Sequence, residues 1–221
     1  REVVHIVLNE TVFHPQGGGQ PSDKGTIGGI QVDKVTLDRS TGVVTHTGIK
    51  VDDSSSLPSP GDMIGLKVDA CLRRKLSECH TAGHVVDAAM AKCGLCLPPT
   101  KGYHFLDGPY VEYRGTIVSS ERADVLEKLS RTFTILLEEN IPTKIEMMSK
   151  IEADRTCNRL AQNFDFSDHP EETVRIVTVA NFPCPCGGTH VRSTGELKES
   201  RWGIKGIKCK RGVVRIKYDQ L

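Results

Sequence analysis

The stretch LRRKLSECHTAGHVVDAAM, residues 72–90, decides the fold of this chain. Its apolar positions recur at steps of three and four residues, which is the spacing of the buried face of an amphipathic helix. Gly94 follows as a helix-ending residue. The spacing therefore predicts one helix from about residue 70 to residue 94, with a buried stripe made of Leu72, Leu76, Cys79, Gly83, Val86 and Met90.

The 69 residues before this helix show no helical period. They contain short β-branched and apolar runs separated by Gly, Pro, Asp and Ser, a pattern typical of strands joined by turns. The runs cover residues 3–8, 25–37, 42–47 and 63–69, and residues 52–61 have the composition of a surface loop. Residues 1–69 are therefore predicted to form a small antiparallel, barrel-like β domain.

The residues after the helix alternate between strand-like and helical patterns. Strands are predicted at 103–106, 110–114, 144–148, 174–179, 204–209 and 213–218. A second helix begins at Ser119 or Ser120 and ends before Pro142, and Ser149 with Glu152 forms a capping box for a third helix that reaches about Leu160. Residues 70–221 are therefore predicted to form an α+β domain with an antiparallel sheet.

Composition points to a soluble globular protein. The 221 residues are 38% hydrophobic and 26% charged, and no apolar run approaches the roughly 20 residues of a membrane helix. Eight cysteines are scattered through a chain without a signal sequence, which favours a reducing compartment such as the cytoplasm. Because residue 1 is Arg, a leader removed from the chain stays possible.

The formal charge of +1 conceals an uneven distribution. Residues 191–221 contain nine basic and three acidic side chains, whereas residues 1–190 contain 20 basic and 25 acidic ones. A basic end on an acidic body is typical of a surface for phosphate groups. A solvated surface sheet with alternating lysines would produce the same count, and charge alone favours that reading.

Four side chains form a candidate zinc site. His80 and His84 lie four positions apart in the predicted helix, so their rings leave one face a turn apart. That spacing alone is more often found on ordinary surface or hydrogen-bonded histidines. Cys186 and His190 form a second pair around a Gly-rich turn, and three nitrogens with one thiolate suit zinc.

The other cysteines offer weaker alternatives. Cys93 and Cys96 form a C-x2-C pair without a second pair to complete a zinc knuckle, and Cys184 is either an alternative ligand or a packed thiol. Cys71, Cys79, Cys157 and Cys209 fall on or beside predicted apolar faces and are expected in the core.

The loop of residues 11–23 contains three consecutive glycines, Gly17, Gly18 and Gly19. No G-K-[ST] or helix follows them, so they are not a P-loop or a dinucleotide fingerprint. Their backbone N–H groups can approach a ligand closely, with Thr11 and Gln20 as hydrogen-bonding side chains. An ordinary tight hairpin explains the same residues and is the preferred reading of the loop alone.

These elements, in this order, resemble the editing domain of alanyl-tRNA synthetase and the free-standing AlaX editing proteins, of which the medium-length type is most similar. The matching motifs are T-x-F-x-P-x-G-G-G-Q-P-x-D-x-G at 11–25, H-x3-H at 80–84, C-G-G-T-H-V-x-x-T-G-E at 186–196 and G-V-x-R-I at 212–216. The resemblance implies zinc-dependent hydrolysis of the ester that joins Ser, or secondarily Gly, to the 3′ adenosine of tRNA(Ala).

The resemblance also implies roles for individual residues. His80, His84, Cys186 and His190 would hold Zn²⁺, and Thr11 and Gln20 would line the pocket that distinguishes Ser from Ala. Basic side chains would hold the acceptor stem: Arg73, Arg74, Lys75, Lys205, Lys208, Lys210 and Arg211. Two other readings remain open, a non-catalytic tRNA-binding module with a structural zinc, and redox or zinc buffering through Cys93, Cys96 and Cys184.

Overall fold

The computed structural model describes residues 2–51, 57–159, 164–167, 169 and 171–221. The chain divides into two compact units, Arg1–Leu76 and Ser77–Leu221, which we call unit 1 and unit 2. The division falls inside helix α1 (Ala70–Lys92), so the first turns of α1 belong to unit 1. The sequence-based boundary between residues 69 and 70 stays a prediction.

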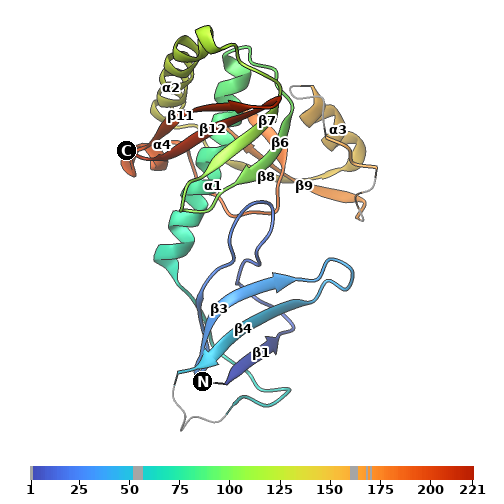
Figure 1. Cartoon of the computed structure of the whole chain (residues 1–221). Coiled ribbons are helices and arrows are strands. Elements are labelled where there is room, and N and C mark those ends of the chain that lie inside the picture. Colours follow the sequence, from blue (N-terminus) through green and yellow to red (C-terminus); the bar gives the residue numbers. More distant parts are fainter. Residues whose placement is uncertain (1, 52–56, 160–163, 168, 170) are drawn as a thin grey trace. The chain divides into compact units, whose positions relative to one another are not determined.

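Unit 1 is built on one five-stranded antiparallel sheet with the order β1-β4-β3-β2-β5. Figure 1 shows β1, β4 and β3 side by side in blue. The strands are β1 (Val3–Val7), β2 (Gly25–Ile27), β3 (Ile30–Leu37), β4 (Val44–Lys50) and β5 (Leu66–Val68). The predicted run at 25–37 is thus a hairpin of two strands. Of the predicted surface loop at 52–61, residues 52–56 lie outside the described residues.

The sheet of unit 1 is open along the described residues, since β1 and β5 occupy its two edges without pairing with each other. The antiparallel β architecture is as predicted, whereas barrel-like closure stays a prediction. The core of this unit consists of Phe13, Ile27, Val32 and Val35, each at most 3% exposed. Val32 and Val35, three positions apart on β3, both face this core because the strand has a bulge between Val32 and Lys34.

The described part of unit 2 contains two antiparallel sheets and four helical segments besides α1. The sheet orders are β11-β12-β7-β6 and β10-β9-β8. The strands are β6 (Pro99–Tyr103), β7 (Tyr110–Arg114), β8 (Lys144–Ser149), β9 (Thr173–Val179), β10 (Phe182–Pro185), β11 (Trp202–Lys210) and β12 (Val213–Gln220). The helices are η1 (Ser119–Glu121), α2 (Arg122–Glu138), α3 (Lys150–Asn158) and α4 (Gly195–Glu199). This mixture of helices and antiparallel sheets confirms the predicted α+β class.

Helix α1 departs from the predicted amphipathic pattern. From Leu76 to Met90 every residue except Asp87 is buried, so within unit 2 the helix has no solvent-exposed face. Its apolar residues join the main core with residues of α2, β7 and β12, and Figure 1 shows α1 running behind the four-stranded sheet. The buried polar residues Glu78, His80 and His84 therefore need partners inside the protein.

Two strands differ from the prediction because both contain proline. β6 begins at Pro99 instead of Tyr103, and β10 (Phe182–Pro185) was not predicted. Each is an edge strand of its sheet, where a residue without an N–H does not break the ladder. The predicted capping box is confirmed, since the Ser149 hydroxyl accepts from the backbone N–H of Glu152, and the predicted end of α3 at Leu160 lies outside the described residues.

Among the described residues, no helix combines the length and the apolar character that a membrane span requires.

Candidate metal centre

Helix α1 and the loop after β10 bring four donor side chains of unit 2 together. The ligand atoms of His80, His84, Cys186 and His190 all lie within 4.8 Å of one another. Sγ of Cys186 is 3.5 Å from Nε2 of His80 and 3.3 Å from Nε2 of His190. The structure thus assembles the predicted set from positions that are 106 residues apart in the chain.

The loop that carries Cys186 is fixed to strand β9 at Arg175. The backbone N–H of Cys186 donates to the carbonyl of Arg175 at 3.1 Å, and the Arg175 guanidinium donates to the carbonyl of Cys186 at 2.5 Å. The N–H of Gly188 donates to Sγ of Cys186 at 3.3 Å. This last contact favours the thiolate form, which is the form that binds metals.

Thr81 sets the tautomer of His190. Its hydroxyl donates to the carbonyl of Ser77 at 2.7 Å, as a threonine in a helix commonly does, so its oxygen can only accept from other groups. It accepts from the backbone N–H of Val191 and lies 3.1 Å from Nδ1 of His190. Nδ1 must therefore carry the proton, which leaves the lone pair of Nε2 directed at the cluster.

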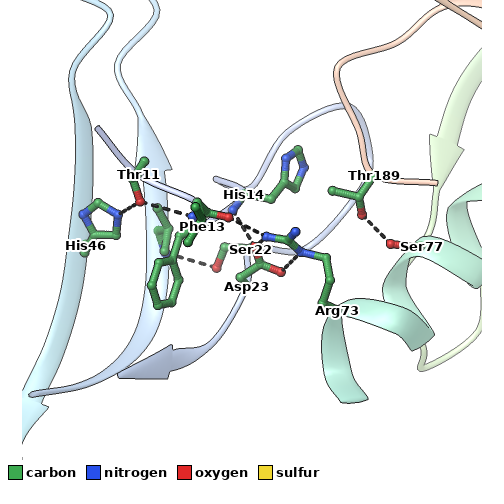
Figure 2. Close-up of polar contacts among 11 residues, drawn as sticks. Thr11, Phe13, His14, Ser22, Asp23, His46, Arg73, Ser77 and Thr189 are labelled. Atoms are coloured by element: carbon green, nitrogen blue, oxygen red, sulfur yellow. Dashed lines mark hydrogen bonds and ion pairs between the residues drawn. The ribbon is translucent and has the colours of Figure 1, made fainter. Parts of the chain in front are cut away.

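A second hydroxyl contact joins the loop to α1. The hydroxyls of Ser77 and Thr189 lie 2.7 Å apart, and Figure 2 shows this hydrogen bond. With the Thr81 contacts, two consecutive loop residues, Thr189 and His190, are held by the helix that supplies His80 and His84. Such outer contacts orient metal ligands.

The protonation state of His84 suits a metal ligand, whereas Cys186 would have to lose its proton on binding. Burial, with a smaller effect of the Arg175 charge, lowers the pKa of His84 to about 4, so its imidazole is neutral at pH 7. Burial raises the pKa of the Cys186 thiol, while the Gly188 N–H and Arg175 oppose the increase. A cation at the cluster would complete the deprotonation, because thiolate ligation and proton release are coupled.

His104 is a member of this region that sequence reasoning missed. Its ring stacks on His80 with centroids 4.2 Å apart, and its Nδ1 lies 2.5 Å from the hydroxyl of Tyr218. Burial lowers the pKa of His104 to about 3, so the ring is neutral. It has no motif around it in the sequence.

Two glycines make room for the His104 ring. A Cβ at Gly83 would lie 2.4 Å from Cε1 of His104, and a Cβ at Gly102 would lie 2.4 Å from its Nε2. The ring therefore occupies a slot between α1 and β6 that only glycine at both positions leaves open. The Gly83 of the H-x3-H motif is thus a packing requirement.

Asp87 and Cys184 form a second group of possible donors with His84. One ligand atom from each of His84, Asp87 and Cys184 lies within 4.8 Å of the others. The Tyr113 hydroxyl donates to Asp87 at 2.6 Å, and burial nevertheless raises the pKa of Asp87 to about 7. Cys184, an undecided alternative in the sequence analysis, is thus outside the four-residue cluster but next to His84.

In unit 1, the predicted substrate residue Thr11 is hydrogen-bonded within the protein, and the predicted substrate residue Gln20 is buried. The Thr11 hydroxyl lies 2.8 Å from Nε2 of His46 and accepts from the N–H of Phe13 (Figure 2). Nδ1 of His46 faces the carbonyl of Ile6, which can only accept, so Nδ1 carries the proton and Nε2 accepts from Thr11. Gln20 is 0% exposed.

The three glycines form a tight hairpin, the alternative that the loop alone favoured. Gly17 and Gln20 exchange two backbone hydrogen bonds, at 3.1 and 2.9 Å. Gly18 and Gly19 between them have φ values of 57° and 80°, which is the type I′ geometry that favours glycine.

Arg73 is committed to the same loop. Its guanidinium forms an ion pair with the buried carboxylate of Asp23 (Figure 2). It also donates to the carbonyl of Val12 at 2.8 Å. Asp23 also accepts from the N–H of His14 at 2.5 Å. The neighbouring Arg74 and Lys75 are exposed, whereas Arg73 is half-buried.

The predicted basic residues at the end of the chain lie on β11 and its turn. Lys208 pairs with Arg215 and Lys210 with Val213, on the face of the four-stranded sheet opposite the core residues Val214 and Ile216. Lys205 lies at a bulge in β11, and Arg211 lies in the β11–β12 turn. All four of the predicted basic residues are exposed.

All eight cysteines are free. Cys79 and Cys157 are buried, as expected, and Cys209 is half-buried against the core. The expectation that Cys71 belongs to the core is wrong, because it lies on the exposed side of the first turn of α1. Cys93 is buried with its thiol 3.3 Å from the Thr132 hydroxyl, whereas Cys96 is exposed, so the C-x2-C pair does not converge on a metal site.

Residues 174–217 match the family described as "Threonyl and Alanyl tRNA synthetase second additional domain". The chain is 30% identical over 209 residues to alanyl-tRNA editing protein AlaX-M of Methanosarcina acetivorans, and the match covers 91% of this chain and 81% of that protein. It is 29% identical over 201 residues to AlaX-L of Pyrococcus horikoshii, covering 89% of this chain and 46% of that protein.

Some alanine–tRNA ligases match over a longer part of this chain. The ligase of Methanosarcina acetivorans is 34% identical over 223 residues, which cover 97% of this chain. The chain spans only 23% of the length of that ligase.

Proposed function

Since the chain belongs to the AlaX family of alanyl-tRNA editing proteins, we propose that it hydrolyses the ester of Ser-tRNA(Ala), and secondarily of Gly-tRNA(Ala). The observation that supports a hydrolase is the cluster of His80, His84, Cys186 and His190. It provides three imidazole rings and a thiol within one ion's reach, at the motif positions that the family resemblance assigns to the metal.

We assign zinc to this cluster because three nitrogens and one sulfur are its preferred tetrahedral donors. When bound, zinc supplies a positive charge that polarises an ester carbonyl or lowers the pKa of a water. The protein's own contribution is orientation. Thr81 holds the His190 ring, and the Arg175 and Gly188 contacts hold the Cys186 loop.

Thr11 is our proposed contact for the hydroxyl of the mischarged serine. Its hydroxyl hydrogen is used by His46 and one lone pair by Phe13, so its oxygen retains one lone pair for a further donor. A serine hydroxyl can use that acceptor and an alanine methyl group cannot. Gln20, the other residue expected to line this pocket, is fully buried in the same loop.

The outer face of the four-stranded sheet is our proposed surface for the RNA backbone. Lys208, Lys210, Arg215 and Lys217 project from β11 and β12 on the face opposite the core. Beside them, Tyr103 stacks on Phe105 and on Tyr110, with centroids 4.6 and 5.2 Å apart. The Arg215 guanidinium lies 4.6 Å from the Tyr110 ring centroid. Basic residues interleaved with aromatic rings suit phosphate and unpaired bases.

Deacylation of Ser-tRNA(Ala) tests the proposal. Protein loaded with zinc is expected to release serine from Ser-tRNA(Ala) and to leave Ala-tRNA(Ala) intact, and removal of the metal by a chelator is expected to abolish release. Absence of serine release by fully loaded protein would refute the editing activity. Full activity after complete zinc removal would refute the metal requirement alone.

A second candidate is a non-catalytic tRNA-binding module with a structural zinc. It is favoured by the number of ligands, since four protein donors fill a tetrahedral shell and a catalytic zinc usually has three. The two candidates differ in one measurement. A structural zinc would leave tRNA binding intact without any serine release, while the editing hydrolase would bind and deacylate.

A further inference from the structure

His84 is shared by two groups of donor atoms. It lies within 4.8 Å of the donors of His80, Cys186 and His190 in one group, and within the same distance of Asp87 and Cys184 in the other. An imidazole has two nitrogens on different edges of the ring, and each can face a different partner. His84 is therefore close both to the other proposed metal ligands and to a second pair of side chains, Asp87 and Cys184.

One ring nitrogen of His84 is buried without a hydrogen-bond partner among the described residues. This nitrogen is Nδ1, and the residue is 6% exposed. A buried unpaired donor costs about 1–3 kcal/mol. Asp87 is three positions further along α1, so its side chain leaves the same face of the helix.

Asp87 can accept a hydrogen bond from Nδ1–H of His84 in addition to the one it accepts from Tyr113. The hydroxyl of Tyr113, which is 2% exposed, donates to Oδ1 of Asp87 at 2.6 Å and fixes the carboxylate. The hydrogen bond from Tyr113 leaves the other carboxylate oxygen of Asp87, Oδ2, as an acceptor. A second donor would stabilise the charged form of this partly buried carboxylate. The nearby Cys184 thiol is a weaker acceptor than a carboxylate oxygen.

We propose that Asp87, held by Tyr113, is a positioning residue that accepts a hydrogen bond from Nδ1–H of His84 and so directs Nε2 of that ring at the metal. This fixes both the tautomer and the ring plane of His84, as Thr81 does for His190. The inference rests on the proposed metal site. It assigns a role to a residue outside the four-ligand motif, and carboxylates of this kind raise the basicity of the histidine they contact.

A different reading of the same atoms is a second metal ion bound by His84, Asp87 and Cys184. Both readings would use the second Asp87 oxygen, Oδ2, because the Tyr113 hydroxyl donates to Oδ1, and the number of bound ions distinguishes them. Two tightly bound zinc ions per chain would overturn the hydrogen-bond proposal in favour of this reading.

Zinc affinity and histidine NMR test the proposal on the full chain. The zinc Kd is measured by competition with a chromophoric chelator for wild type, Asp87→Asn, Tyr113→Phe and Asp124→Asn. Asp124 is an exposed residue of α2. Asp124→Asn is therefore the control, because it makes the same change of charge outside the cluster. Asp87→Asn is expected to weaken zinc binding 10- to 100-fold, Tyr113→Phe less, and Asp124→Asn not at all.

Long-range ¹H–¹⁵N spectra of zinc-loaded wild type add a readout that does not depend on a variant's folding. His84 is expected to carry its proton on Nδ1 and to bind through Nε2, and its Nδ1–H signal is expected to move in Asp87→Asn. Metal binding through Nδ1, or an Asp87→Asn affinity equal to wild type, would overturn the positioning role. Failure of wild type to bind zinc would instead refute the metal site, and this inference with it.

Discussion

The Thr81 hydroxyl lies 3.1 Å from Nδ1 of His190, and 109 positions separate the two residues in the chain. The same oxygen accepts from the backbone N–H of Val191 and donates to the carbonyl of Ser77. One hydroxyl therefore joins the helix to the loop, and it determines which nitrogen of a proposed metal ligand carries the proton.

Replacing Thr81 by Val keeps the shape of the side chain and removes this hydroxyl. We expect the free energy of unfolding to fall by about 1–3 kcal/mol, because the Val191 N–H is then left without its buried acceptor. Zinc affinity should weaken about 10- to 100-fold. Chemical denaturation of the metal-free protein and zinc competition measure the two effects.

Thr134→Val is the matched control for Thr81→Val. The Thr134 hydroxyl also donates to the carbonyl four residues earlier, that of Ser130, but it lies on the exposed side of α2. It should change neither quantity by a comparable amount. Equal effects of both variants would show that the Thr81 hydroxyl acts only within its own helix.

Cys186→Ala is expected to eliminate tight zinc binding, because it removes the only sulfur donor of the four-residue cluster. Cys93→Ala is the control, since Cys93 is a buried thiol that contacts Thr132. Elemental analysis after gel filtration should find zinc in wild type and Cys93→Ala only. Absence of zinc from Cys93→Ala would point to buffering by the other cysteines.

The glycine hairpin predicts unequal costs for three neighbouring substitutions. Gly18→Ala and Gly19→Ala should each destabilise unit 1 by about 1 kcal/mol, since both positions have positive φ. Gly17→Ala should be neutral, because a Cβ at Gly17 meets no atom within 4 Å. Thermal unfolding measures the costs, and a Gly17→Ala variant that is stable but inactive on Ser-tRNA(Ala) would identify a substrate contact.

Stability in unit 1 should decrease in weak acid through His46. Burial lowers the pKa of His46 below its ordinary value of 6.5, and the Ile6 carbonyl opposes this only partly. The unfolded chain therefore binds a proton near pH 6.5 that the folded chain does not yet bind. The contribution of neutral His46 to the free energy of unfolding is present above pH 6.5 and is lost as the pH falls towards the folded pKa.

Urea unfolding at a series of pH values from neutral to weakly acidic measures this decrease. His46→Gln should give a shallower decrease than wild type, and subtracting the two curves removes the contribution of the other histidines. Identical curves for the two proteins would contradict the assignment of a neutral His46.

Charge reversal tests the proposed RNA surface. The double variant Lys208→Glu, Lys210→Glu should weaken tRNA binding at least tenfold and reduce the dependence of log Kd on log salt by about one for each phosphate that is no longer neutralised. Lys144→Glu, on the exposed strand β8 of the other sheet, is the control. Fluorescence anisotropy with labelled tRNA(Ala) provides the affinities, and equal weakening in all variants would indicate only a general charge effect.

The sequence predicts the parts of this fold that depend on local patterns. The strands of unit 1, helix α2 and the capping box of α3 all follow from periodicity or from turn and cap residues, and the structure contains them. The strands β6 and β10 are misplaced or missed in the prediction because Pro99, Pro183 and Pro185 count against a strand, and the position of a strand at a sheet edge is a tertiary property.

The candidate site is predictable only where a motif marks it. His80, His84, Cys186 and His190 stand in two short patterns, whereas His104 and Asp87 stand in none. Each of the latter gains its place through residues distant in the chain, Tyr218 for His104 and Tyr113 for Asp87. The sequence pattern of α1 also gives no indication of Asp87, because a stripe of apolar residues predicts one buried face. In the structure, the helix is buried on all sides between Leu76 and Met90.

Gly83 stands between the two histidines of the H-x3-H motif, and the space that its missing side chain leaves is occupied by His104. A methyl group at position 83 would lie 2.4 Å from His104 and 2.8 Å from the Tyr218 hydroxyl. Across evolution, positions 83 and 104 are therefore expected to vary together. A relative that carries alanine or a larger residue between its two helical histidines must have a smaller side chain in place of His104, and would then support its first histidine by some other contact than a stacked ring.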